Sequence, residues 1–187
     1  MIPRILVIPG LPGSSPAAAL VSAAAVELAV LGADVTRISP EDHPLPLLGA
    51  DPATDATLPS AARRLADLVA AHDAVLVAMP EINASLPALL KNMLDWTARA
   101  PAHRGVSIWA DKPVALVVAS DEPGRGEGAA AHLAAILAHL GASVIGDAAV
   151  LGVGDDTGEA DGLDEADAAR LKALCRSLER AANLQPD

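Results

Sequence analysis

Residues 74–96 read AVLVAMPEINASLPALLKNMLDW, and this stretch indicates the class of the fold. The run AVLVAM at residues 74–79 has the length and aliphatic character of a strand buried on both faces. A polar loop follows, and after it the apolar residues recur at spacings of three and four, which predicts a helix with one buried face. The apolar residues of that face are Leu86, Leu89, Leu90, Met93 and Leu94. A buried strand followed by such a helix is the unit of α/β proteins with parallel sheets.

The same alternation runs along the whole chain. Helical spacing separates four further aliphatic runs, which predict strands at residues 4–9, 35–38, 114–119 and 144–151. Gly32 and Gly141 each stand just past a helical pattern, where a glycine commonly ends a helix. We therefore predict an α/β fold whose five-stranded parallel sheet is covered by helices on both faces. No internal repeat or linker interrupts the pattern, so we expect one domain over residues 1–187.

The composition excludes several classes of function. The 187-residue chain carries a net charge of −11 and no cluster of Lys and Arg, so nucleic acid is not an expected partner. It has no Phe or Tyr and only two Trp, so its core must be built from Leu, Val, Ile and Ala. No apolar run approaches the roughly 18 residues that span a bilayer, and the N-terminal apolar run is too short for a signal peptide. We expect a cytoplasmic protein with no membrane partner.

Three loops are predicted at the carboxyl ends of strands one, three and four, where ligands bind in such sheets. The first reads GLPGSS at residues 10–15 and leads into a helix. Gly10 and Gly13 allow a close approach of an anion to backbone amides, and Ser14 and Ser15 add hydroxyl donors. The same residues also suit a tight turn with Ser15 as the helix N-cap, so this loop by itself leaves both interpretations open.

The second loop and its helix, PEINASLPALLKNMLDW at residues 80–96, closely resemble the PEYNGSxPxxLKNxxDW signature of the NAD(P)H-dependent FMN reductases, a family that includes quinone, azo-dye and chromate reductases. The resemblance extends to PLPL at residues 44–47, which is similar to the family's DLPL segment, and to DKPVA at residues 111–115, which is similar to GKPVA. It implies a flavodoxin-like three-layer sandwich with the strand order 2-1-3-4-5. It also implies bound FMN and self-association to a dimer or tetramer.

With FMN as the cofactor, the first loop is expected to bind the phosphate, and the loops after strands three and four the ring. The expected cofactor-binding residues are Gly10, Gly13, Ser14, Ser15, Pro80, Glu81, Ile82, Asn83 and Ser120. No catalytic acid or base is expected, because nicotinamide and flavin carry the chemistry and the protein contributes position. The prediction is an oxidoreductase that passes electrons from NADPH or NADH through FMN to a small-molecule acceptor: a quinone, a dye, a metal ion or free flavin.

An alternative is a non-catalytic flavodoxin-like interaction or regulatory protein with a degenerate flavin site. The family's phosphate loop reads GSxRxxSxN, whereas here Leu11 stands for the first Ser and Gly13 for the Arg. Ile82 stands for the signature's Tyr, and Ala84 for its Gly. The loss of an Arg and polar donors weakens phosphate recognition unless other groups compensate.

Several other polar residues are expected to be structural. Lys91, Asn92 and Asp95 are expected to fix the helix after the second loop and a subunit contact, and Trp96 to lie in the core or at an interface. Cys175 is expected to be a small core residue. The five scattered histidines complete no metal site.

Three stretches, rich in Pro and polar residues or simply joining predicted elements, are expected to be surface loops: residues 39–59, 98–112 and 155–167. The acids Asp164 and Glu165 at the end of the last loop favour the N-terminus of the final helix.

Overall fold

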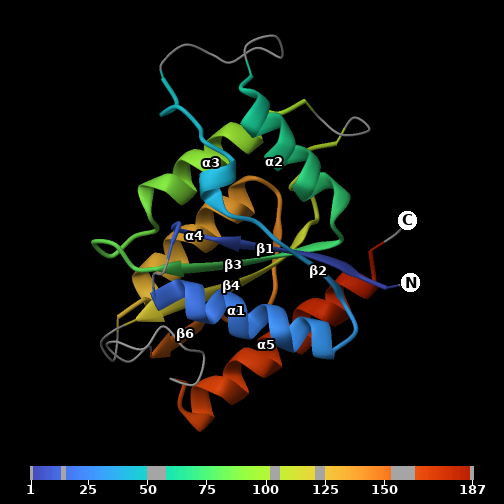
Figure 1. The fold of residues 1–187 in the computed structure, drawn as a ribbon, viewed down its shortest axis with the longest axis vertical. Helices are drawn as coiled ribbons and strands as arrows, with labels where there is room; N and C mark the ends of the chain where they lie inside the picture. Colours follow the sequence, from blue (N-terminus) through green and yellow to red (C-terminus); the bar gives the residue numbers. More distant parts are fainter. Residues whose placement is uncertain are drawn as a thin grey trace.

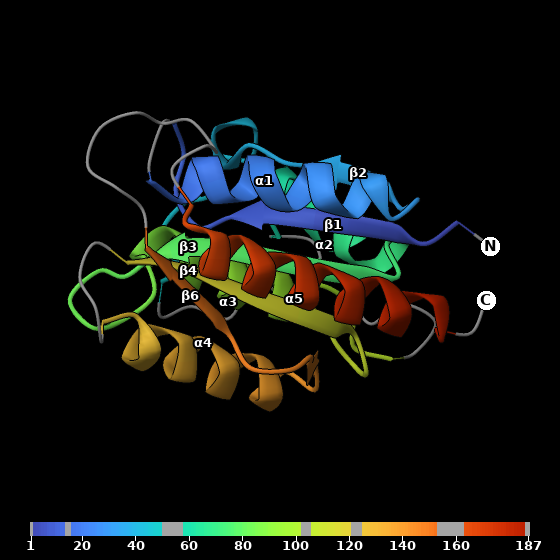
Figure 2. The ribbon, with the colours of Figure 1, turned by 90° about the horizontal axis from the view of Figure 1, so that it is seen from below.

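The structure is a computed structural model that describes residues 2–13, 16–49, 58–101, 106–120, 125–152 and 163–185. A parallel sheet lies at the centre, with helices on both faces (Figures 1 and 2). Its strand order is β2-β1-β3-β4-β5, which confirms the predicted order 2-1-3-4-5 of flavodoxin-like folds. The first four strands are β1 (Arg4–Pro9), β2 (Asp34–Arg37), β3 (Ala74–Pro80) and β4 (Pro113–Ser120).

The prediction of a single fifth strand at residues 144–151 was wrong. The chain forms two short strands there, β5 (Ser143–Val144) and β6 (Ala149–Gly152), which both pair in parallel with β4. Between them Gly146 has a φ of +65°, which takes the backbone out of the extended conformation. The chain therefore leaves the edge of β4 after its first residues and rejoins it near its carboxyl end, and the sheet has six strands.

The helices form the two outer layers. On one face lie α1 (Pro16–Val30) and α5 (Glu165–Asn183), and on the other lie α2 (Ser60–Ala71), α3 (Ala88–Ala98) and α4 (Glu127–His139). A 3-10 turn, η1 (Pro40–Asp42), follows β2. The predicted helix-ending glycines, Gly32 and Gly141, follow α1 and α4 with φ values of +91° and +92°. No helix among the described residues is both long enough and apolar enough to cross a membrane.

Alternation along the strands divides the core into two aliphatic layers. Residues such as Ile5 and Leu76 pack against α1 and α5, whereas Leu6 and Val77 face α2, α3 and α4. Every residue of β4 is buried, as expected for a central parallel strand. Branched aliphatic side chains of the strands thus fill both core layers, although the chain has no Phe or Tyr.

One part of the expected surface loop at residues 98–112 proved to be core. Trp109 is 1% exposed and Ile108 is 8% exposed, and both pack in the core layer between the sheet and helices α2, α3 and α4. The Trp109 indole Nε1 donates to Thr97 Oγ1 at 3.3 Å, so its polar atom is also satisfied. The prediction failed because a lone Trp between polar and small residues gives no periodic signal.

Candidate functional site

The carboxyl ends of β1, β3 and β4 lie side by side, so the loops that follow them share one edge of the sheet (Figure 1). Pro9 of β1 pairs with Ala78, and Pro80 at the end of β3 pairs with Ala119. This is the edge at which parallel α/β sheets bind their ligands, between strands where the order reverses. The candidate site is therefore the set of loops at residues 10–13, 81–85 and 125–126, together with the end of β4.

The loop after β1 begins as an extension of the sheet. The Gly10 amide donates to the Ala78 carbonyl at 2.7 Å, and a Cβ at Gly10 would lie 2.6 Å from the Cβ of Met79, so only glycine fits there. Gly13 then turns the chain with a φ of +72°, and no atom lies within 4 Å of the position that a Cβ would take there. The amides of Leu11 and Gly13 make no hydrogen bond within the described residues, which leaves them as donors for an anion. Ser14 and Ser15 lie outside the described residues.

The loop after β3 folds as a tight hairpin over residues 81–85. Ile82 and Ser85 exchange backbone hydrogen bonds of 2.9 and 3.0 Å around the tip formed by Asn83 and Ala84. Both tip residues have positive φ, +51° and +58°, as the type I′ turn requires. The hairpin holds Ile82 44% exposed. It thus presents an apolar side chain and main-chain groups at the predicted ring-binding position.

The 81–85 hairpin is joined to α4 by two side-chain contacts. Glu81 Oε2 accepts a hydrogen bond from the Gly126 amide at 2.7 Å, and Ser85 Oγ lies 2.8 Å from His132 Nδ1. Gly126 has a φ of +97°, and a Cβ there would lie 2.6 Å from Val150 Cγ1. Glu81 was among the expected cofactor residues, and Gly126 lies in the loop after strand four that was expected at the ring, but His132 was not expected to contribute. A single exposed His on a helix carries no signal of its partner in the chain.

Ser120 is the last residue of β4, and it is 7% exposed. It lies level with Gly152 at the end of β6, whose amide donates to Asp167 Oδ2 at 2.7 Å. Asp164 is the N-cap of α5 and accepts from the Asp167 amide at 2.7 Å, which confirms that this acid favours the start of the last helix. Much of the predicted loop at 155–167, from 155 to 162, lies outside the described residues, as do residues 121–124.

The polar residues of α3 make contacts within the chain, as expected for residues that fix this helix. Asn92 accepts from the Leu48 amide at 2.9 Å and donates to the Pro46 carbonyl at 3.0 Å. Trp96 is 7% exposed, and its indole Nε1 donates to the same carbonyl at 2.8 Å. These contacts fasten residues 46–48 onto α3. On the same helix, Lys91 and Asp95 form an ion pair of 2.6 Å.

No three His, Cys, Asp or Glu side chains among the described residues are arranged to hold a metal ion. Cys175 is fully buried, and this burial, with a smaller effect of Glu27, raises the pKa of its thiol to about 12. It is therefore an unreactive core residue, as expected.

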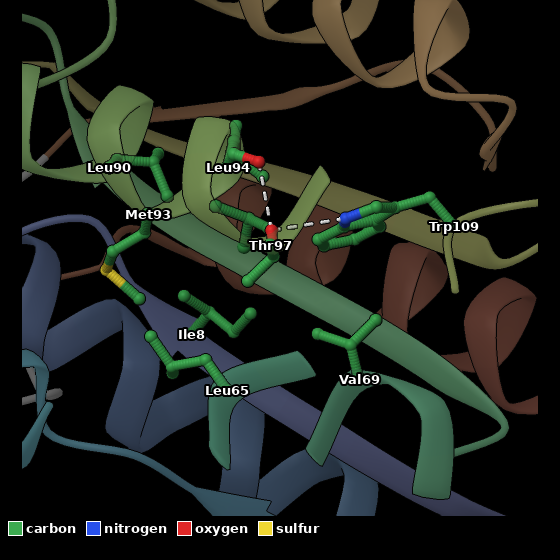
Figure 3. Close-up of a pocket in the computed structure, with 9 residues that line it drawn as sticks. Ile8, Leu65, Val69, Leu90, Met93, Leu94, Thr97 and Trp109 are labelled. Carbon is green, nitrogen blue, oxygen red and sulfur yellow. Dashed lines mark hydrogen bonds between the residues drawn. The ribbon is translucent and has the colours of Figure 1, made fainter. Parts of the chain in front are cut away.

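An apolar cavity of about 10 Å³ lies between α2, α3 and the sheet (Figure 3). Leu65, Leu90, Met93 and Trp109 are among the side chains that surround it. It is a packing gap in the core and is too small for a cofactor.

The chain is similar in sequence to known reductases. The model of a protein family described as NADPH-dependent FMN reductase matches residues 3–156. An NADPH:quinone oxidoreductase of Arabidopsis thaliana is 39% identical over 74 residues, which cover 40% of this chain and 35% of that protein. A 2-hydroxy-1,4-benzoquinone reductase of a Burkholderia species is 36% identical over 96 residues, 51% of this chain and 50% of that protein. The chain thus matches half or less of the length of these relatives.

A solved structure resembles the chain over almost its whole length. It is FerB, a flavoenzyme NAD(P)H:(acceptor) oxidoreductase from Paracoccus denitrificans, with 25% sequence identity and a TM-score of 0.74. The similarity covers 97% of this chain and 98% of that one.

Proposed function

Because the chain belongs to the family of NADPH-dependent FMN reductases, we propose that it is an FMN-dependent oxidoreductase that transfers electrons from NADPH or NADH to a quinone. The observation that carries the proposal is the position of the 80–96 motif. Its loop forms a hairpin at the carboxyl end of β3, beside an amide-rich loop after β1 and the end of β4. Quinone as the acceptor class is supported by the names of the relatives in Arabidopsis and Burkholderia.

The donor set of the first loop fits a phosphate. The amides of Leu11 and Gly13 are available, and Gly13 offers no side chain that would obstruct an anion. We propose that the amides of Leu11 and Gly13 and the hydroxyls of Ser14 and Ser15 hold the phosphate of FMN, while Gly10, whose amide is bonded to Ala78, lets the loop pass close to Met79. With no Arg in this loop, amides and hydroxyls bear the whole of its recognition.

The second loop fits the flavin ring. We propose that Pro80, the backbone of Glu81, Ile82 and Asn83 line it, with Ser120 close by at the end of β4. The exposed Ile82 offers apolar contact, and the backbone of a rigid two-residue turn offers polar groups in fixed positions. The Glu81 carboxylate already accepts the Gly126 amide, so it serves as a structural acceptor rather than a proton carrier.

When bound, FMN supplies a ring that takes up a hydride and gives up electrons to an acceptor. The residues of this chain bind, orient and shield the reactants, and orientation alone is a large part of the rate gain in such reactions. No acid or base from the chain is required.

We also propose that the protein forms a dimer or tetramer through α3 and the segment fastened to it. Leu47 lies in that segment between the anchored Pro46 and Leu48 and is 84% exposed, which suits an apolar contact with a second copy. Light scattering that gives a monomer of 18.8 kDa at micromolar concentration would contradict this. A cytoplasmic location remains our prediction, to be tested by cell fractionation.

The visible spectrum of the purified protein tests the main proposal. We expect flavin absorption that survives desalting, one FMN per chain, and oxidation of NADPH or NADH that depends on added benzoquinone. Free FMN as the acceptor is the comparison assay, because it separates a quinone reductase from a reductase of free flavin. A wild-type protein that binds no FMN even at millimolar concentration would refute the proposal and favour the non-catalytic alternative.

A further inference from the structure

The 81–85 hairpin depends on α4 for its position. A two-residue hairpin with two backbone hydrogen bonds is marginal by itself in water. Its tip residues Asn83 and Ala84 are exposed, so packing of the tip contributes little. Ala84 also has the left-handed conformation that an L-residue with a Cβ adopts at a cost. The side-chain interactions that hold the hairpin come from its two ends, while the Ala84 carbonyl lies near Gly128 of α4, where a Cβ would be 3.6 Å from it.

Both ends are tied to α4. At the first end, Glu81 Oε2 accepts the Gly126 amide at 2.7 Å, and at the second, Ser85 Oγ meets His132 Nδ1 at 2.8 Å. These four residues are called the clasp below. The N-cap residue of α4 is Gly126, which has no side chain for capping. The Glu81 carboxylate, from another loop, accepts the hydrogen bond of the Gly126 amide in place of a capping side chain. It does so at the N-terminus of α4, where a negative charge is favoured.

We propose that Glu81, Ser85 and His132 are positioning residues, which set the conformation of the hairpin before the flavin ring binds to it. This inference rests on the proposed function, because it assigns the ring to the hairpin. The clasp lets the protein bind the ring without first ordering a mobile loop, and avoiding that ordering raises affinity. Loss of one contact should therefore weaken the binding of the ring while leaving the phosphate loop unchanged.

Two ligands separate these effects, because riboflavin has the ring of FMN without its phosphate. We expect Glu81→Ala and His132→Ala each to weaken FMN and riboflavin by the same factor, roughly 3- to 30-fold, in fluorescence titrations of the apoprotein. Glu81→Gln and His132→Asn should restore most of the affinity, because Gln keeps an acceptor for the Gly126 amide and the Asn amide reaches the position of Nδ1. The double variant Ser85→Ala/His132→Ala should bind the flavins no more weakly than either single variant, since the two side chains form one contact.

Matched controls lie on the same helix. Glu127→Gln removes an exposed carboxylate from the first turn of α4, and His139→Ala removes an exposed His from its last turn. Neither residue contacts the hairpin among the described interactions, so both variants should bind FMN and riboflavin as the wild type does. Circular dichroism confirms that each variant is folded. Where an Ala variant is not folded, Ser85→Ala carries the test, because it removes the contact with His132 through a smaller change and should weaken both flavins by a similar factor.

Amide hydrogen exchange in the apoprotein gives a reading without any flavin. The amides of Ile82 and Ser85 close the hairpin, and we expect them to exchange faster in Glu81→Ala and His132→Ala but not in the controls. Equal flavin affinities in wild type and clasp variants would overturn the inference, as would a loss confined to FMN. If the wild type binds neither flavin, the proposed function fails and the inference with it, a result that is distinguishable because it appears before any variant is made.

Discussion

Replacing Ala84 by glycine should stabilise the protein, although the same replacement in a helix destabilises. Ala84 occupies the second tip position of the 81–85 hairpin with a φ of +58°. The left-handed conformation costs an L-residue roughly 1–2 kcal/mol that glycine does not incur. Glycine in turn loses more freedom on folding, about 0.4–1 kcal/mol. The difference predicts a net gain of about 0.5–1 kcal/mol for Ala84→Gly.

The measurement is thermal and urea unfolding of the apoprotein. For a chain of this length, the gain corresponds to a rise in Tm of roughly 1–4 °C. The matched control is Ala138→Gly, at an exposed position in the last turn of α4 with ordinary helical backbone, where Tm should fall because glycine is a poorer helix former than alanine. Asn83→Gly is a second control: its φ is +51°, but Asn tolerates this conformation, so its effect should be small.

Changes in Tm of opposite sign for Ala84→Gly and Ala138→Gly would support the hairpin geometry. If Ala84→Gly lowered Tm as Ala138→Gly does, the type I′ turn assigned to the tip would be wrong, and with it the rigid backbone proposed to meet the flavin ring.

Three further predictions concern groups outside the hairpin. Asn92→Leu should destabilise the protein by roughly 1–3 kcal/mol in urea unfolding, since it leaves the Leu48 amide without its acceptor; unchanged stability would show that Asn92 does not hold residues 46–48. Cys175 should resist a thiol reagent at pH 8 in the native protein and react fully in denaturant, because burial raises its pKa to about 12; rapid native labelling would contradict its place in the core. Burial, and secondarily the charge of Arg64, lower the pKa of His43, so the folded state binds a proton there less readily than the unfolded chain. Tm should therefore decline as pH falls below about 6.5, where the unfolded chain takes up that proton. The decline should be smaller in His43→Gln.

Local patterns in the sequence were sufficient for most of the framework. Strand β1 lies at the predicted residues 4–9, and β3 and β4 extend at most one residue at either end beyond their aliphatic runs. The reason is that a strand buried on both faces needs an uninterrupted aliphatic run, which few other structures tolerate. Gly32 and Gly141 marked helix ends because the left-handed residue that closes a helix is usually glycine.

The same local reasoning failed where a neighbour distant in the sequence decides the conformation. The run at 144–151 was predicted as one strand, yet the edge of β4 accepts it only in two pieces around Gly146. Trp109 looked like part of a loop until the packing of α2 and α3 enclosed it. The strand order itself came from the resemblance in residues 80–96 and not from the alternation of strands and helices.

The sequence by itself determined the α/β architecture, the family, and which loops reach the carboxyl edge of the sheet. Only the tertiary structure decided which side chains hold those loops. Glu81 meets Gly126 across 45 residues, Ser85 meets His132 across 47, and Leu48 meets Asn92 across 44. Hydrophobic periodicity shows which face of a helix or strand is buried, because many residues along the element repeat the same apolar signal. A single hydrogen bond between two polar residues has no period, so its partner is known only once the chain has folded.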